Sequence, residues 1–171
     1  IAQHLGAIPE AIDAVLAKFG EDLNDGDAVI MNDPYHGGMH LPDIFMFMPL
    51  FYAGKRRAFA VVICHHTDVG GRVPGSNASD STEIYQEGIR IPALRLCEGG
   101  VYNDTLIQIL CLNVRIPATF MGDLRAQVAA CTVGARRLVA LTDVYGSDTL
   151  EGIFDVLLDR SEQLTRQALR A

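Results

Sequence analysis

The sequence contains no tryptophan, and its 171 residues include no continuous apolar run near the ~18 residues that a membrane-spanning helix needs. Basic residues are also scarce, since 14 Lys and Arg stand against 21 Asp and Glu, for a formal net charge of -7. An acidic chain does not attract a phosphate backbone or an anionic membrane surface. Nucleic-acid and membrane binding are therefore disfavoured, and in the absence of a signal peptide we expect a cytoplasmic protein.

The sequence has few cysteines, and they show no metal-binding or redox spacing. The four cysteines are far apart, none lies in a CxxC motif, and their neighbours are apolar, as in "VVICHH" and "IQILCLNV". This pattern favours buried free thiols over disulfides or a cysteine-bound metal. The residues are Cys64, Cys97, Cys111 and Cys131.

What the sequence does contain is 49% hydrophobic residues, enough for a sizeable core. A helix of about three turns is predicted between Pro9 and Gly20, and two apolar strands are predicted within 44–66, joined by a turn at 53–55. Pro49 favours an edge position or a bulge in the first strand. From residue 122 apolar residues recur every three or four positions, which predicts two long helices joined near Gly146 and packed antiparallel.

These elements predict an α+β fold, in which a central, mostly antiparallel β-sheet carries metal-site loops and a C-terminal pair of long antiparallel helices follows. We expect a β-rich catalytic core over residues 1–118 and a helical hairpin over 119–171, both within one segment, 1–171. The glycine-rich stretch between the second strand and residue 88 is predicted to be a long structured loop, and such loops often carry function.

Four of the five histidines lie at the two ends of the predicted strand pair, in "NDPYHGGMHLPDI" and "HHTDVGG". Antiparallel pairing would bring both polar loops together. Two neutral imidazoles and one carboxylate can hold a divalent ion and leave coordination positions open. The sequence therefore predicts a metal site formed by His40, Asp43 and His65.

Other interpretations of the same residues stay open. His40 and His65 are also compatible with ordinary strand-end histidines bonded to backbone groups. Asp33 either fixes the turn before Pro34 or joins the site. A zinc-protease helix is excluded because two glycines separate His36 from His40, and a Ser/His/Asp arrangement lacks a GxSxG elbow. The serines available for such an arrangement are Ser76, Ser79 and Ser81.

Four stretches, "GDAVIMNDPYHGGMHLPDI", "HHTDVGG", "PGSNASDSTEIYQEGIRIPALRL" and "GDLRAQVAA", together resemble the hydantoinase B/oxoprolinase family over essentially the whole chain. The resemblance implies that this chain is a segment of a longer subunit. It also implies a hydantoinase A-like partner that binds ATP and phosphorylates the substrate, so that the B-like subunit completes the reaction in a hetero-oligomer.

The family's carboxylase branch holds a metal through motif positions that correspond here to His40, Asp43 and His65. His36, His66 and Asp68 also match motif positions, and we predict catalytic roles for them, with His66 or Asp68 orienting a ligand or moving a proton. The resemblance implies a divalent cofactor, Zn²⁺ or Mn²⁺, with Fe²⁺ also compatible. The leading prediction is ATP-dependent opening of a lactam or hydantoin ring; the alternatives are a subunit of an acetone or acetophenone carboxylase and a non-catalytic assembly module.

Overall fold

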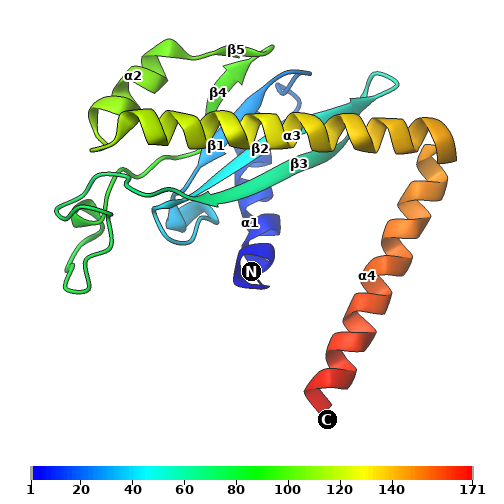
Figure 1. Ribbon diagram of the computed structural model, residues 1–171. Coiled ribbons are helices and arrows are strands. Elements are labelled where there is room, and N and C mark those ends of the chain that lie inside the picture. The colour runs from blue at the N-terminus through cyan, green and yellow to red at the C-terminus, as the bar shows by residue number, and fades with distance from the viewer. Residues whose placement is uncertain (1, 171) are drawn as a thin grey trace. The chain divides into compact units, whose positions relative to one another are not determined.

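The structure, a computed structural model, describes the backbone of residues 2–170 and the side chains of residues 4–170. Within these residues, five strands form one sheet in the order β3-β2-β1-β4-β5, and each neighbouring pair is antiparallel (Figure 1). The strands are β1 (Ala28–Met31), β2 (Asp43–Tyr52), β3 (Lys55–His65), β4 (Leu94–Glu98) and β5 (Val101–Tyr102). The helices are α1 (Ala2–Phe19), α2 (Asp104–Leu112), α3 (Pro117–Tyr145) and α4 (Ser147–Arg170), with 3₁₀ turns η1 (Pro34–His36) and η2 (Ile84–Gln86). The predicted α+β class is confirmed.

The long hairpin of β2 and β3 dominates the sheet. Its two-residue turn, Ala53 and Gly54, has φ values of 50° and 73°, the left-handed backbone that matches the twist of paired strands. Pairing runs from Tyr52 opposite Lys55 to Asp43 opposite His65, which confirms the predicted hairpin. Pro49 is not on an edge strand: it lies opposite Phe59 of β3, beyond the stretch of β2 that pairs with β1, and the β2–β3 register shifts just after it, between Leu50 and Phe51.

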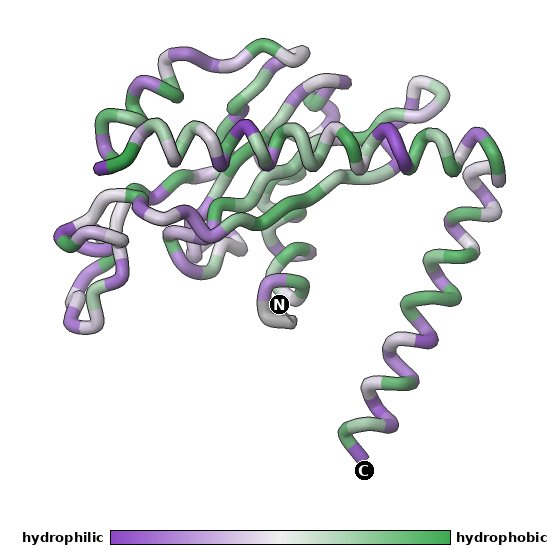
Figure 2. The backbone as a smooth tube through the Cα atoms, in the orientation of Figure 1, coloured by the Kyte–Doolittle hydropathy of each residue, from purple (hydrophilic) through white to green (hydrophobic). Residues whose placement is uncertain are grey.

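Both faces of the sheet are covered, and alternate residues of each strand face opposite layers. Residues such as Val29, Phe45 and Phe47 pack with α1, whereas residues such as Ile30, Ile44 and Met46 pack with α2 and the first part of α3. Figure 1 shows α1 and the first part of α3 on opposite sides of the strands, and Figure 2 shows that β2 and β3 are largely hydrophobic. This two-sided burial fixes which side chains of the hairpin share a face with α1.

Several boundaries differ from the predictions. α1 begins at Ala2, so Pro9 lies inside the helix, where its lack of an N–H removes one backbone bond without ending the helix. α2 was not predicted, because "DTLIQILCL" is a short apolar run that a strand would also show; the Asn103 side chain caps it by accepting a hydrogen bond from the Leu106 N–H at 3.0 Å. α3 begins at Pro117, close to the predicted boundary at 118/119.

The chain divides into two compact units, residues 1–135 and 136–171, with the boundary inside α3. In the second unit, Gly146 separates α3 from α4 with φ of 82°, which confirms the predicted junction, and Leu150 is buried near it. The antiparallel packing of α3 and α4 stays a prediction. All four cysteines are free thiols, two of them buried, and none of the described helices is long and apolar enough to cross a membrane.

Candidate metal site

Three side chains converge where β2 begins and β3 ends. His40, Asp43 and His65 each offer one donor atom, and the three atoms lie within 4.8 Å of one another. The Asp43 Oδ1 is 2.8 Å from the His65 Nδ1, and the Asp43 Oδ2 is 4.0 Å from the His40 Nδ1. The two imidazole rings are stacked, with centroids 5.5 Å apart. The predicted set is therefore brought together by the hairpin.

The burial of these three residues differs in a way that suits a binding site. Asp43 is buried, His40 is partly exposed and His65 is exposed, with side-chain exposures of 8%, 39% and 57%. The carboxylate thus lies at the floor while both imidazoles border solvent. Two imidazoles and one carboxylate are a donor set that Zn²⁺, Mn²⁺ or Fe²⁺ accepts, and an open side leaves room for further ligands.

The loop that carries His40 is held by buried hydrogen bonds. Asn32, fully buried at the end of β1, donates from its side-chain amide to the carbonyls of Leu41 at 2.7 Å and Ile89 at 2.9 Å. Its side-chain oxygen accepts from the Ile91 N–H at 2.6 Å. Because Leu41 follows His40 directly, this amide fixes the backbone on which the imidazole is mounted.

The turn before His40 is fixed by Asp33 and Gly37. The Asp33 carboxylate caps η1 by accepting from the Tyr35 N–H at 3.1 Å, which confirms the interpretation of Asp33 as a turn residue. Gly37 has φ of 89°, and a Cβ there would lie 2.5 Å from the Ala11 backbone nitrogen. Only glycine fits that close approach between the loop and α1.

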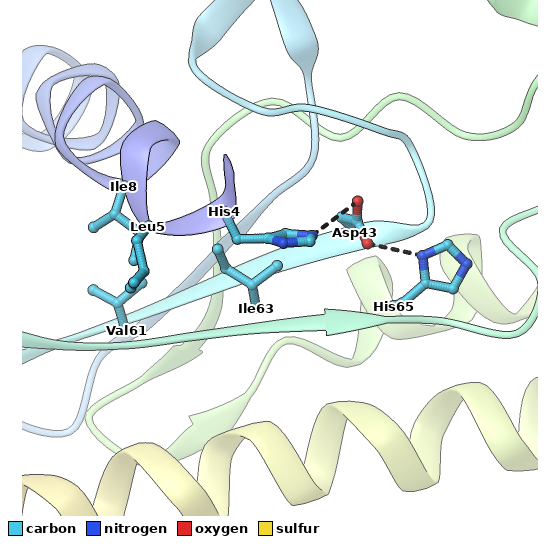
Figure 3. A pocket seen from close by; sticks show the side chains of 7 residues that line it. All are labelled: His4, Leu5, Ile8, Asp43, Val61, Ile63 and His65. Atoms are coloured by element: carbon cyan, nitrogen blue, oxygen red, sulfur yellow. Dashed lines mark hydrogen bonds and ion pairs between the residues drawn. The ribbon is translucent and has the colours of Figure 1, made fainter. Parts of the chain in front are cut away.

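A fourth histidine, which the sequence did not predict, approaches the site from α1. The His4 Nε2 lies 3.5 Å from the Asp43 Oδ2, and its side chain is 37% exposed (Figure 3). His4 precedes Asp43 by 39 residues, and no local pattern shows that the first turns of α1 lie over the end of the hairpin. His4 also borders two hollows beside the site, one of about 410 Å³ with Met39 and His40 and one of about 510 Å³ toward β3.

His36 and His66 lie outside the three-residue cluster. The His36 Nδ1 is 3.0 Å from the Asp33 Oδ2, and its side chain is 62% exposed. His66 is fully buried: its Nε2 donates to the Gln127 Oε1 at 2.9 Å, and its ring lies against Phe120 of α3. Burial lowers the pKa of His66, although the hydrogen bond to Gln127 acts in the opposite direction. The neutral imidazole thus links the sheet to α3.

Asp68 organises the loop that follows β3. Its carboxylate accepts hydrogen bonds from the N–H groups of Gly70, Gly75 and Arg115, and the Arg115 Nη1 lies 2.9 Å from the Asp68 Oδ2. Burial alone would raise the pKa of Asp68, but these bonds outweigh it and lower the pKa to about 2. Asp68 therefore holds the loop to the segment between α2 and α3.

Comparisons with known proteins identify the family that this chain resembles over its whole length. The family described as hydantoinase B/oxoprolinase matches residues 1–171. The beta subunit of caprolactamase from Pseudomonas jessenii is 39% identical over 167 residues, covering 98% of this chain and 29% of that subunit. 5-Oxoprolinase 1 from Arabidopsis thaliana is 33% identical over 180 residues, covering 98% of this chain and 14% of that protein.

A solved structure shows the same fold. The crystal structure of ATP-dependent caprolactamase from Pseudomonas jessenii superposes with a TM-score of 0.89 at 39% identity, covering 98% of this chain and 29% of that one. The chain thus spans less than a third of the length of the relatives it matches. Because the family match covers every residue and a relative of the same fold shares more than a third of its sequence, this chain belongs to the hydantoinase B/oxoprolinase family.

Proposed function

We propose that this chain is the metal-binding part of a subunit in an ATP-dependent enzyme that opens a cyclic amide. The observation that carries the proposal is the convergence of the His40, Asp43 and His65 donor atoms within 4.8 Å, beside a hollow that Asp43 and His65 line. The relatives include an ATP-dependent caprolactamase and a 5-oxoprolinase, and both names describe action on a cyclic amide.

The donor set fits a divalent cation. Asp43 would offer a carboxylate oxygen from the buried floor, and His40 and His65 would offer neutral imidazole nitrogens from the rim. When bound, such an ion supplies Lewis acidity, which polarises a substrate oxygen and lowers the pKa of water. Zn²⁺ and Mn²⁺ are our first candidates, and Fe²⁺ is compatible with the same ligands.

An amide needs activation because resonance weakens its carbonyl as an electrophile. We propose that a hydantoinase A-like partner binds ATP and phosphorylates the amide oxygen, which removes this resonance. The chain's own residues would then hold the activated ring beside His40 and His65, where water can reach it. Water attacks the ring carbon, the C–N bond breaks with the nitrogen leaving as an amine, and a second water releases the phosphate. Asn32 keeps that rim in place through its bond to the Leu41 carbonyl.

In this proposal, His36, His66 and Asp68 help to hold the backbone around the site. Asp68 fixes the loop after β3 through Arg115, and His66 fixes the strand end through Gln127. His36 is mounted on Asp33 at the solvent-facing side of η1. Direct participation of His36, His66 or Asp68 in proton transfer stays a prediction.

The test is a metal and turnover assay on the complete subunit combined with its ATP-binding partner. We expect about one divalent ion per subunit and ATP-dependent ring opening, and Asp43→Asn should reduce both metal affinity and turnover by at least about 100-fold. Asp13→Asn, an exposed position of α1, is the matched control and should change neither. Wild-type metal content and turnover in the Asp43→Asn enzyme would refute the proposal, and carboxylation of a ketone by the same enzyme would favour the carboxylase alternative.

A further inference from the structure

The hollow of about 510 Å³ beside the metal site has two chemically distinct ends. At one end lie His4, Asp43 and His65, joined by the contacts drawn in Figure 3. The volume lies within the range of about 300–1,000 Å³ that small-molecule sites occupy. A substrate whose reacting group sits at the polar end can therefore place its remaining atoms against the other end.

The other end is aliphatic. Val61 and Ile63 lead away from His65 along one face of β3, because alternate residues of a strand share a face at steps of about 7 Å. Leu5 and Ile8 face them from the first turns of α1 (Figure 3). None of the described side chains that line the hollow belongs to lysine or arginine. A carboxylate substituent that points along this wall would thus meet hydrocarbon, with no lysine or arginine among these lining residues to pair with it.

We propose that this pocket selects neutral cyclic amides with a hydrocarbon ring, and that Ile8, Val61 and Ile63 determine this specificity. The inference rests on the proposed function, since it takes the amide group to lie at His40, Asp43 and His65. The hydrocarbon of the ring would then contact the aliphatic wall, and each added methylene should improve kcat/KM about three- to fourfold until the pocket is full.

A matched pair of substrates tests the proposal in the complete ATP-dependent enzyme. 2-Pyrrolidone and 5-oxoproline share the same five-membered ring and differ by one carboxylate. We expect kcat/KM for 2-pyrrolidone to exceed that for 5-oxoproline by at least about 100-fold, and the seven-membered unsubstituted lactam to exceed 2-pyrrolidone by about 10-fold. A preference for 5-oxoproline, or indifference to ring size, would overturn the proposal.

Two variants test whether the aliphatic wall itself determines the substrate preference. Ile8→Arg adds a cation to the pocket. It should lower the ratio of kcat/KM for 2-pyrrolidone to kcat/KM for 5-oxoproline at least about 10-fold. Ala17→Arg adds the same charge at an exposed position of α1 outside the pocket and should leave the ratio unchanged. Equal ratios in both variants would refute the role of Ile8. If Ile8→Arg does not fold, Ile63→Ala replaces it and should abolish the gain from a larger ring.

Equilibrium binding of the unsubstituted lactams, measured by calorimetry, separates this inference from the proposed function. Ring-size-dependent binding without metal-dependent turnover would refute the proposed function and support the pocket. Metal-dependent turnover with unselective binding would support the proposed function and refute the pocket.

Discussion

Asp43 and His65 lie directly opposite each other at the open end of the β2–β3 pair, with the Asp43 Oδ1 2.8 Å from the His65 Nδ1. Because the paired residues of an antiparallel ladder share one face, the backbone itself aims both side chains toward α1. His40 joins them from the preceding loop. Each part of this arrangement gives a measurable expectation.

His65 and His36 form a natural matched pair. Each is a largely exposed histidine, 57% and 62% by side chain, whose Nδ1 lies beside a buried aspartate at 2.8 and 3.0 Å. Only His65 belongs to the three-residue cluster. We expect His65→Gln to weaken divalent-metal binding at least about 100-fold, because it removes a ligand, and His36→Gln to leave the affinity unchanged. Competition titration with a chelating dye measures both, and equal affinities would argue against the metal site.

Substitutions at Gly37 and Gly54 can distinguish the stability cost of a steric clash from the cost of a strained backbone conformation. Both have positive φ, 89° and 73°, but a Cβ on Gly37 would meet the backbone of α1 at 2.5 Å, whereas nothing lies within 4 Å of one on Gly54. We expect Gly54→Ala to cost about 1 kcal/mol of unfolding free energy, and Gly37→Ala at least about 2 kcal/mol more. Urea denaturation of the two variants checks this difference. Equal costs would mean that the loop and α1 are not held in contact.

Gln127 joins α3 to the sheet through groups that water cannot reach. It accepts from His66 at 2.9 Å and donates to the Ile44 carbonyl at 2.8 Å. We expect Gln127→Leu to lower the unfolding free energy by about 3 kcal/mol, because it leaves buried polar groups without partners. Gln163→Leu, at an exposed position of α4, is the control and should change it by less than about 0.5 kcal/mol. A small effect of Gln127→Leu would show that water satisfies His66.

The lowered pKa of Asp68 predicts that the folded protein loses stability in acid. Its pKa is lowered to about 2 in the folded protein, below the ordinary value of 3.8, so the folded state binds its proton less readily than the unfolded state. The resulting stabilisation, about 2 kcal/mol, is fully present above pH 4 and is lost as the pH falls toward 2. Asp68→Asn should remove this dependence in acid denaturation curves. Asp80→Asn, in the same loop but with a side chain 78% exposed, should retain it.

The sequence predicted the hairpin and the three-residue cluster because both follow from local chemistry. Two apolar strands around a glycine turn define a register, and the register places residue 65 opposite residue 43. The sequence did not reveal that β1 pairs with β4, more than 60 residues later, or that Asn32 binds three backbone groups, two of them 57 and 59 residues away. These contacts depend on the packing of the whole sheet, which no short pattern encodes.

Long-range packing also determines the partners of His4, His66 and Asp68. The approach of His4 to Asp43 depends on how α1 crosses the sheet, and the contacts of His66 depend on where α3 lies. The sequence predicted that Asp68 orients a ligand or moves a proton, whereas the bonds that its carboxylate makes with Arg115 come from a segment 47 residues away. Local sequence gave the chemical type of each residue but not its partner.

The two-residue turn at Ala53 and Gly54 sets the strand register that places His65 opposite Asp43 in the distant cluster. Removing or adding one residue there would slide one strand of the hairpin against the other and turn the opposite set of side chains toward α1. A slip of one place can bring the Cys64 thiol to the position opposite Asp43 and send the His65 imidazole toward α3. A thiolate is a softer ligand than an imidazole and would shift the preference from manganese toward zinc. If the cluster holds a metal ion as proposed, the length of the hairpin turn, ten residues from Asp43, would thus help determine which metal the cluster prefers.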